Sequence, residues 1–128
     1  DFGVPVDLER LICATLGVKE ACRYRDICGT GAIYTPPVGM FETLRSGMLA
    51  SVISSQRLVS AIPNVYSTAN YLMGPYTALS YGGLMDYRAK TGLNRPALLL
   101  ADRSPLCDNK LVSDAMGWTL AQLREKLI

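Results

Sequence analysis

The sequence contains no histidine among its 128 residues. This absence excludes histidine general acids and bases, Ser-His-Asp and Cys-His nucleophile systems, and imidazole metal ligands. A catalytic proton transfer would need Cys, Asp, Glu, Tyr or Lys instead. Tyr34 or another tyrosine could serve only if a nearby cation lowered its pKa. The sequence therefore leaves the catalytic residues and any cofactor unassigned.

An excess of one charge is also absent, because 13 basic and 11 acidic residues leave a net charge of +2. So small a surplus argues against a polyanion binder, and we expect no nucleic-acid partner. No run of about 20 predominantly apolar residues occurs, because proline, glycine and polar residues interrupt every apolar stretch. We therefore expect no membrane-spanning segment.

Cysteine is sparse, and the chain lacks a Cys-x-x-Cys pair. Cys13, Cys22, Cys28 and Cys107 are separated by eight, five and 78 residues, whereas zinc sites use tight pairs, so we predict no metal site. Free thiols in a reducing intracellular compartment are the favoured interpretation. Two structural disulfides and a metal or redox role are the alternatives.

The length fits one compact domain with a real core, and 49% hydrophobic residues against 19% charged ones argue against disorder. We expect residues 1–128 to form a single domain. Because the chain begins at Asp1 and not at methionine, the expected alternatives are a processed product, an excised piece of a longer chain and an incomplete sequence.

The patterning predicts a mainly α fold. Asp7 and Gly17 bracket a first short helix, and Asp108 and Gly117 bracket a later one. Thr119 begins the last helix with a capping-box pattern. The longest candidate is expected to stop at Pro63. The predicted helices span 7–16, 18–28, 38–62, 65–73, 76–90, 109–116 and 119–127.

Two short segments read as β-strands. Residues 32–35 precede Pro36-Pro37, and residues 97–101 form the apolar run Ala-Leu-Leu-Leu-Ala. Such a length suits a buried strand better than a helix. We expect these strands to pair with each other or to add to a sheet from elsewhere.

The most informative absence is a gap in charge. Residues 58–85 contain no Asp, Glu, Lys or Arg, and the wider range 46–85 contains only Arg57. We call 46–85 the uncharged segment. Protein interfaces favour aromatic residues and exclude charge from their centres. The predicted interface residues are Met48, Val52, Tyr66, Tyr71, Tyr76 and Tyr81.

Three interpretations of this segment remain open: a helical hairpin in the domain's own core, a surface buried against another chain, and a small-molecule pocket. The leading hypothesis is a non-catalytic assembly module. It would bury the uncharged segment against copies of itself, as a homo-oligomer, or against a partner subunit.

The alternative hypothesis is a small histidine-free enzyme or ligand-binding domain with an anionic-ligand site. Asp102 and Arg103 follow the predicted strand 97–101, and ligand sites are common at the carboxyl ends of strands. Arg103 could pair with an anion, and Asp102 could accept a proton or simply cap a turn. The backbone N–H groups of Gly29 and Gly31 could add to such a site.

Overall fold

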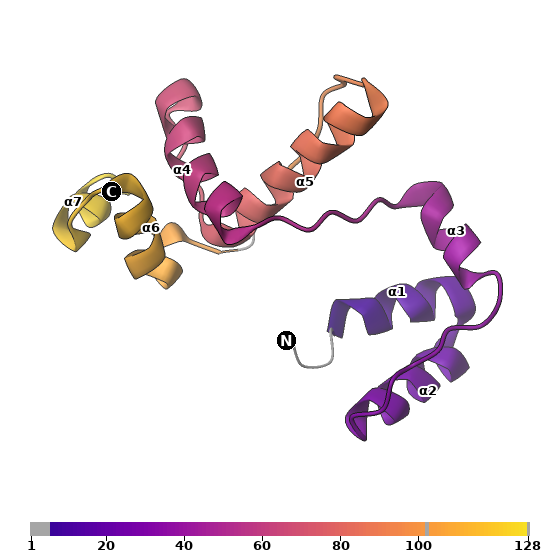
Figure 1. Cartoon of the computed structure of the whole chain (residues 1–128). Coiled ribbons are helices and arrows are strands. Elements are labelled where there is room, and N and C mark those ends of the chain that lie inside the picture. Colours follow the sequence, from indigo (N-terminus) through magenta and orange to yellow (C-terminus); the bar gives the residue numbers. More distant parts are fainter. Residues whose placement is uncertain (1–5, 102, 128) are drawn as a thin grey trace. The chain divides into compact units, whose positions relative to one another are not determined.

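The computed structural model describes residues 6–101 and 103–127 (Figure 1). Within these residues the chain forms seven α-helices and one short 3-10 turn. The prediction of a mainly helical protein is therefore confirmed. None of these helices has the length and apolar character needed to cross a membrane.

The chain divides into two compact units, Asp1–Leu49 and Ala50–Ile128. Each unit has its own cluster of buried apolar side chains. The single domain expected over residues 1–128 stays a prediction.

The first unit is built on a helical hairpin, α1 (Val6–Leu16) and α2 (Val18–Gly29), followed by α3 (Met40–Gly47). Gly17 alone joins α1 to α2, and its φ of +89° is a conformation that favours glycine. This tight turn lets the two helices pack side by side. The buried cluster between the helices contains Ile12, Ala21, Tyr24 and Met40.

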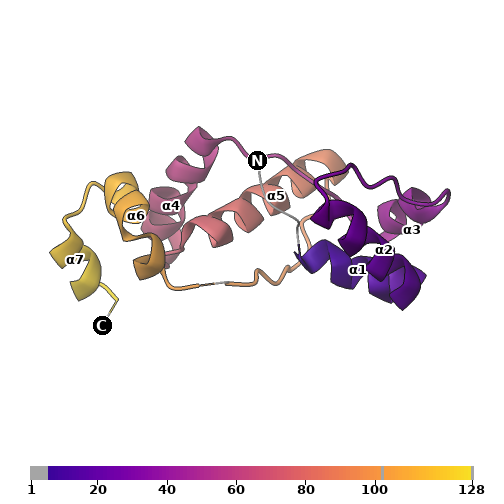
Figure 2. The same cartoon turned by 90° about the horizontal axis from the view of Figure 1, so that it is seen from below.

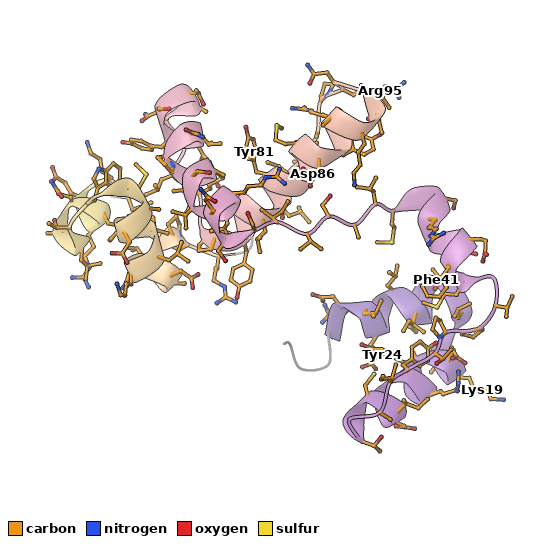
Figure 3. The ribbon with its side chains drawn as sticks, in the orientation of Figure 1. Lys19, Tyr24, Phe41, Tyr81, Asp86 and Arg95 are labelled. Atoms are coloured by element: carbon orange, nitrogen blue, oxygen red, sulfur yellow. The ribbon has the colours of Figure 1, made fainter. Side chains whose placement is uncertain are left out.

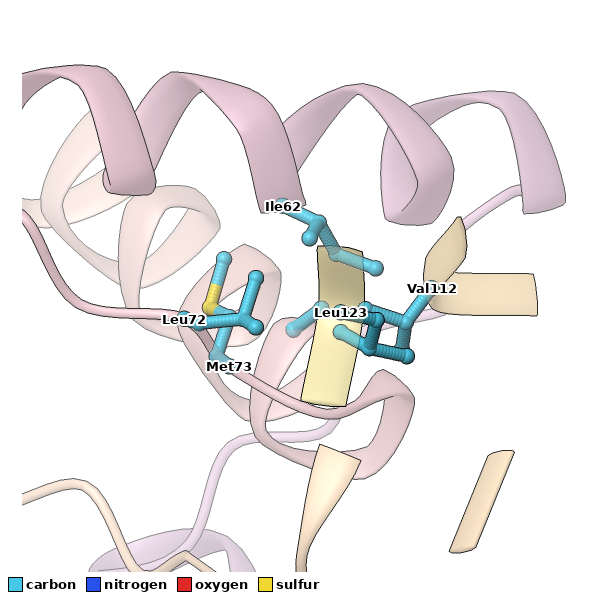
Figure 4. Packing of buried hydrophobic residues seen from close by; sticks show 6 residues of the cluster. Ile62, Leu72, Met73, Val112 and Leu123 are labelled. Carbon is cyan, nitrogen blue, oxygen red and sulfur yellow. The ribbon is translucent and has the colours of Figure 1, made fainter. Parts of the chain in front are cut away.

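The second unit contains α4 (Ser55–Ala69), α5 (Pro75–Thr91), η1 (Pro105–Asp108), α6 (Asn109–Met116) and α7 (Leu120–Glu125). Helix α4 packs against both α5 and α6. Figure 4 shows the centre of this packing, where side chains from several elements meet. The buried cluster contains Ile62, Leu72, Met73, Ala78, Val112 and Leu123.

Several predicted helix ends are confirmed. Gly117 closes α6 with a φ of +66°. Thr119 and Gln122 form the predicted capping box, in which the Thr119 side chain accepts from the Gln122 N–H and the Gln122 side chain accepts from the Thr119 N–H. The predicted helix over 76–90 corresponds closely to α5.

The predicted helix over 38–62 is wrong, because it is interrupted at residues 48–54. Met48 is extended, and Ser54 caps the start of α4 by accepting a hydrogen bond from the Arg57 N–H. The physical reason is local: Gly47, β-branched residues and serines favour breaks and caps over a continuous helix.

The predicted helix end at Pro63 is wrong, because Pro63 lies inside α4, which continues to Ala69. A proline removes one backbone hydrogen bond and costs stability in a helix interior. Its neighbour Ile62 is fully buried in the cluster of the second unit, and burial of this helix face offsets that cost. The helix predicted over 65–73 is therefore the end of α4 plus a loop, with Asn70 left-handed at φ +51°.

Neither predicted strand is present, since the part of the chain that the structure describes contains no β-strand. Residues 32–35 lead into Pro36-Pro37, which cannot donate to a ladder. The Tyr34 ring instead meets Tyr24 edge-on, at 5.1 Å between centroids. Residues 97–101 are extended but unpaired, and they run back along α5 towards η1 (Figure 2).

Candidate functional site

Helix α5 buries one side and exposes another that has no charged residue from Tyr76 to Tyr87. Thr77, Ala78 and Gly82 face the interior. The opposite side follows helical spacing and contains Tyr76, Leu79, Ser80, Gly83 and Tyr87, which we call the α5 stripe. Tyr76 is 46% exposed, Leu79 36% and Tyr87 37%.

Asp86 is the one charged residue of α5 between Tyr76 and Tyr87, and it forms an ion pair with α4. Arg57 on α4 donates from Nη2 to Oδ1 of Asp86 on α5, at 2.8 Å. This hydrogen bond lowers the pKa of Asp86 and raises the pKa of Arg57. Both groups therefore stay ionised together, and their charges cancel locally. Figure 3 shows Asp86 on α5.

The predicted interface residues fall into two groups. Val52 is 96% exposed, and Met48 and Tyr71 are also exposed, as is Tyr76. In contrast, Tyr66 and Tyr81 are half-buried and pack against the cluster of the second unit. The Tyr66 ring meets the Trp118 ring edge-on at 5.1 Å between centroids. Part of the uncharged segment is thus core, and part is surface.

The residues predicted for an anion site are placed as follows. Arg103 lies over the ring of Tyr76, with its guanidinium carbon 4.6 Å from the ring centroid. Asp102 lies outside the described residues. Gly29 ends α2, and Gly31 follows it with a φ of +77°. Both glycines belong to the first unit, whereas Arg103 belongs to the second.

Tyr34 has the wrong pKa shift for a catalytic base. Burial, together with a hydrogen bond from its hydroxyl to Oε1 of Glu20 at 2.8 Å, raises the pKa of Tyr34 to about 12. The same hydrogen bond lowers the pKa of Glu20. The nearby Arg23, which pairs with Glu20, does not reverse this direction. Tyr34 is therefore a neutral hydrogen-bond donor in the packing of the first unit.

The second unit also has an open groove of about 580 Å³ that sequence reasoning missed. No sequence signal joins its two walls, since one comes from α4 and the other from η1 and α6. Within the described residues, Asp108 Oδ2 is buried without a hydrogen-bond partner, and Lys110 pairs with Asp114 at 2.8 Å. The lining residues are Val59, Cys107, Asp108, Asn109, Lys110, Leu111, Asp114 and Ala115. With two acids and one base, this groove does not suit an anion.

The four cysteines are free thiols. Cys13, Cys22 and Cys28 are half-buried in the first unit, and Cys107 is exposed in the second. Across residues 6–101 and 103–127, no three Cys, Asp or Glu side chains gather in a group that could hold a metal ion.

Comparisons with protein-family models, with curated proteins and with solved structures find no match to this chain.

Proposed function

We propose that this chain is a non-catalytic assembly module that buries the α5 stripe, and adjoining parts of the uncharged segment, against copies of itself or a partner subunit. The observation that carries the proposal is the stripe itself. From Tyr76 to Tyr87 the exposed side of α5 presents tyrosine, leucine, serine and glycine without a charged residue.

Exposed sides of other helices in this chain differ. Helix α2 exposes Arg23, Arg25 and Asp26. Helix α6 exposes Lys110 and Asp114. A solvent-facing helix surface normally carries such charges, because they keep it hydrated. The α5 stripe departs from that pattern within the same chain.

The composition of the stripe suits association. Covering Tyr76, Leu79 and Tyr87 would remove apolar area from water at roughly 25 cal/mol per Å². Arg57 and Asp86 already neutralise each other, whereas the Arg103 guanidinium over the Tyr76 ring would be covered together with that ring. Ser80 and Gly83 at the middle of the stripe are small, so another backbone could approach closely.

Sedimentation velocity over a range of micromolar concentrations tests self-association. Leu79→Asp would place a charge in the buried patch and is expected to shift the chain to monomer. The matched control is Leu120→Asp, because Leu120 is similarly exposed at 39% and lies on α7. We expect this control to associate like the unmodified chain.

An unmodified chain that stays monomeric would contradict self-association through this stripe, as would equal dissociation of both variants. Association with a partner subunit is tested with the same pair of variants, by comparing the native mass of complexes assembled in the natural host. A partner retained fully by Leu79→Asp would count against the stripe as its contact surface.

A further inference from the structure

Residues 97–101 form an extended, largely exposed segment whose backbone makes no hydrogen bond to the rest of the described chain. Within the described part of the chain, no hydrogen bond is made by the main chain of these five residues. Leu98 is 87% exposed and Leu100 is 77% exposed, whereas Leu99 between them is half-buried. Ala97 and Ala101 are exposed as well, so Leu99 is the one residue of the five that is partly covered by its own protein.

We propose that residues 97–101 pair with the same segment of a second copy, as a two-stranded antiparallel ladder centred on Leu99. This interaction goes beyond the assembly role of the α5 stripe, because it uses the main chain of a different segment and does not require that stripe. It identifies the partner as an identical chain and the contact as main-chain hydrogen bonding.

The sequence of the segment selects a second copy as the occupant. Ala-Leu-Leu-Leu-Ala reads the same in both directions. An antiparallel pair with twofold symmetry places each residue opposite its mirror position, so Leu98 meets Leu100 of the copy and Ala97 meets Ala101. The four exposed leucines then cluster on one face.

Pro96 determines which residues of the segment point their N–H and C=O groups at the partner strand. A proline has no N–H, so it fits only where its nitrogen points away from the partner strand. Under this condition Leu99 forms a hydrogen-bonded pair with Leu99 of the copy. Ala97 of each chain forms a further such pair with Ala101 of the other chain. The ladder would contain roughly six main-chain hydrogen bonds.

The flanking charges limit the ladder to this length. The same register places Arg95 opposite Arg103 of the copy, and like charges directly opposite are unfavourable. Arg103 also lies over Tyr76 in its own chain. A five-residue, two-stranded ladder is marginal in water, so we expect weak association that strengthens when salt screens the arginines.

Sedimentation equilibrium and infrared spectroscopy on the same samples test the proposal. Because no strand occurs in the described residues of one chain, a β-sheet amide band that grows with the dimer fraction reports the ladder. Variants with Leu79→Asp should retain this band, which separates the ladder from association through the α5 stripe.

Proline substitutions test which residues point their N–H groups at the copy. Leu99→Pro removes an N–H that points at the copy, and we expect dimerisation at least about tenfold weaker than in Leu99→Ala. Leu98→Pro removes an N–H that points away, so it should stay within about threefold of Leu98→Ala. Trp118 fluorescence should be unchanged in all four variants, because both positions lie outside the buried cluster of the second unit.

Three results would overturn the proposal. The first is a dimer without a β-sheet band, which would leave the α5 stripe as the contact. The second is that Leu99→Pro and Leu98→Pro weaken dimerisation equally, each compared with the alanine variant at the same position. The third is a β-sheet band that appears only when another protein with an open sheet edge is added, because the occupant would then not be a second copy.

Discussion

Two adjacent glycines in α5 offer a sharp test of the packing in the second unit. An ideal Cβ added at Gly82 would lie 3.0 Å from both Cδ1 and Cγ1 of Ile53, and 3.2 Å from its Cγ2. A Cβ added at Gly83 would have no neighbour within 4 Å. Gly82→Ala and Gly83→Ala therefore change the same helix in the same way, and only the first meets a packed side chain.

The expected magnitudes follow from two opposing effects. Replacing glycine by alanine in a helix interior stabilises it by about 1 kcal/mol. Gly83→Ala should therefore raise the free energy of unfolding by about 1 kcal/mol. At Gly82 the new methyl group approaches three atoms of Ile53, including the branch at its Cβ, so rotating the side-chain tip cannot relieve the contact. Overpacking of this kind costs about 1–3 kcal/mol, so Gly82→Ala should be net destabilised by about 1 kcal/mol.

Urea denaturation followed by Trp118 fluorescence measures both variants. Trp118 is the only tryptophan of the chain and packs against the cluster of the second unit, so its signal reports that unit. The protein should be dilute enough to be monomeric, since Gly83 lies on the α5 stripe. Shortening Ile53 to alanine should remove the conflict, so Gly82→Ala in that background should stabilise. Equal stabilisation by Gly82→Ala and Gly83→Ala in the native background would refute this account.

The remaining predictions concern one helix cap and one buried hydroxyl. Thr119→Ala removes the capping box of α7 and should lower the free energy of unfolding by about 1 kcal/mol, measured by the same fluorescence titration; an unchanged value would contradict the capping role. Tyr34 has a folded pKa raised to about 12. Its contribution to stability should therefore be fully present below its unfolded pKa of about 10 and be lost as pH rises through the folded value. Tyr34→Phe should remove this alkaline loss in thermal melts, and an identical pH profile in both chains would refute it.

Much of the helical fold could be predicted because its signals are local. Gly17 and Gly117 both adopt positive φ at the predicted helix ends, and the Thr119–Gln122 spacing alone identified a capping box. Such features depend on residues that are close together in the sequence, and no distant contact is needed.

The incorrect predictions concern segments whose structure depends on packing against, or pairing with, residues that are distant in the sequence. Proline statistics predicted a helix end at Pro63, but Ile62 beside it is buried against residues that follow much later in the chain. The run at 97–101 has strand composition, yet a strand forms only when another supplies hydrogen bonds. No such partner lies within the described residues.

The candidate site was only partly accessible to sequence reasoning for a related reason. The gap in charge identified the uncharged segment, but it could not separate Tyr81, which packs on the cluster, from Tyr76, which stays half exposed. The spacing 76, 79, 80, 83 and 87 does define one side of a helix. Which side faces the core depends on α4, and in particular on the burial of Ala78 and Gly82.

The pairing of Arg57 with Asp86 changes what the uncharged segment implies. Were Arg57 unpaired, the segment would carry one positive charge that any covering surface would have to desolvate or match. Because Asp86 accepts its hydrogen bond at 2.8 Å, that charge is matched within the chain. A surface that covers the α5 stripe therefore needs no acidic group to match Arg57. A second copy, which presents the same uncharged stripe, meets that condition without any change in sequence.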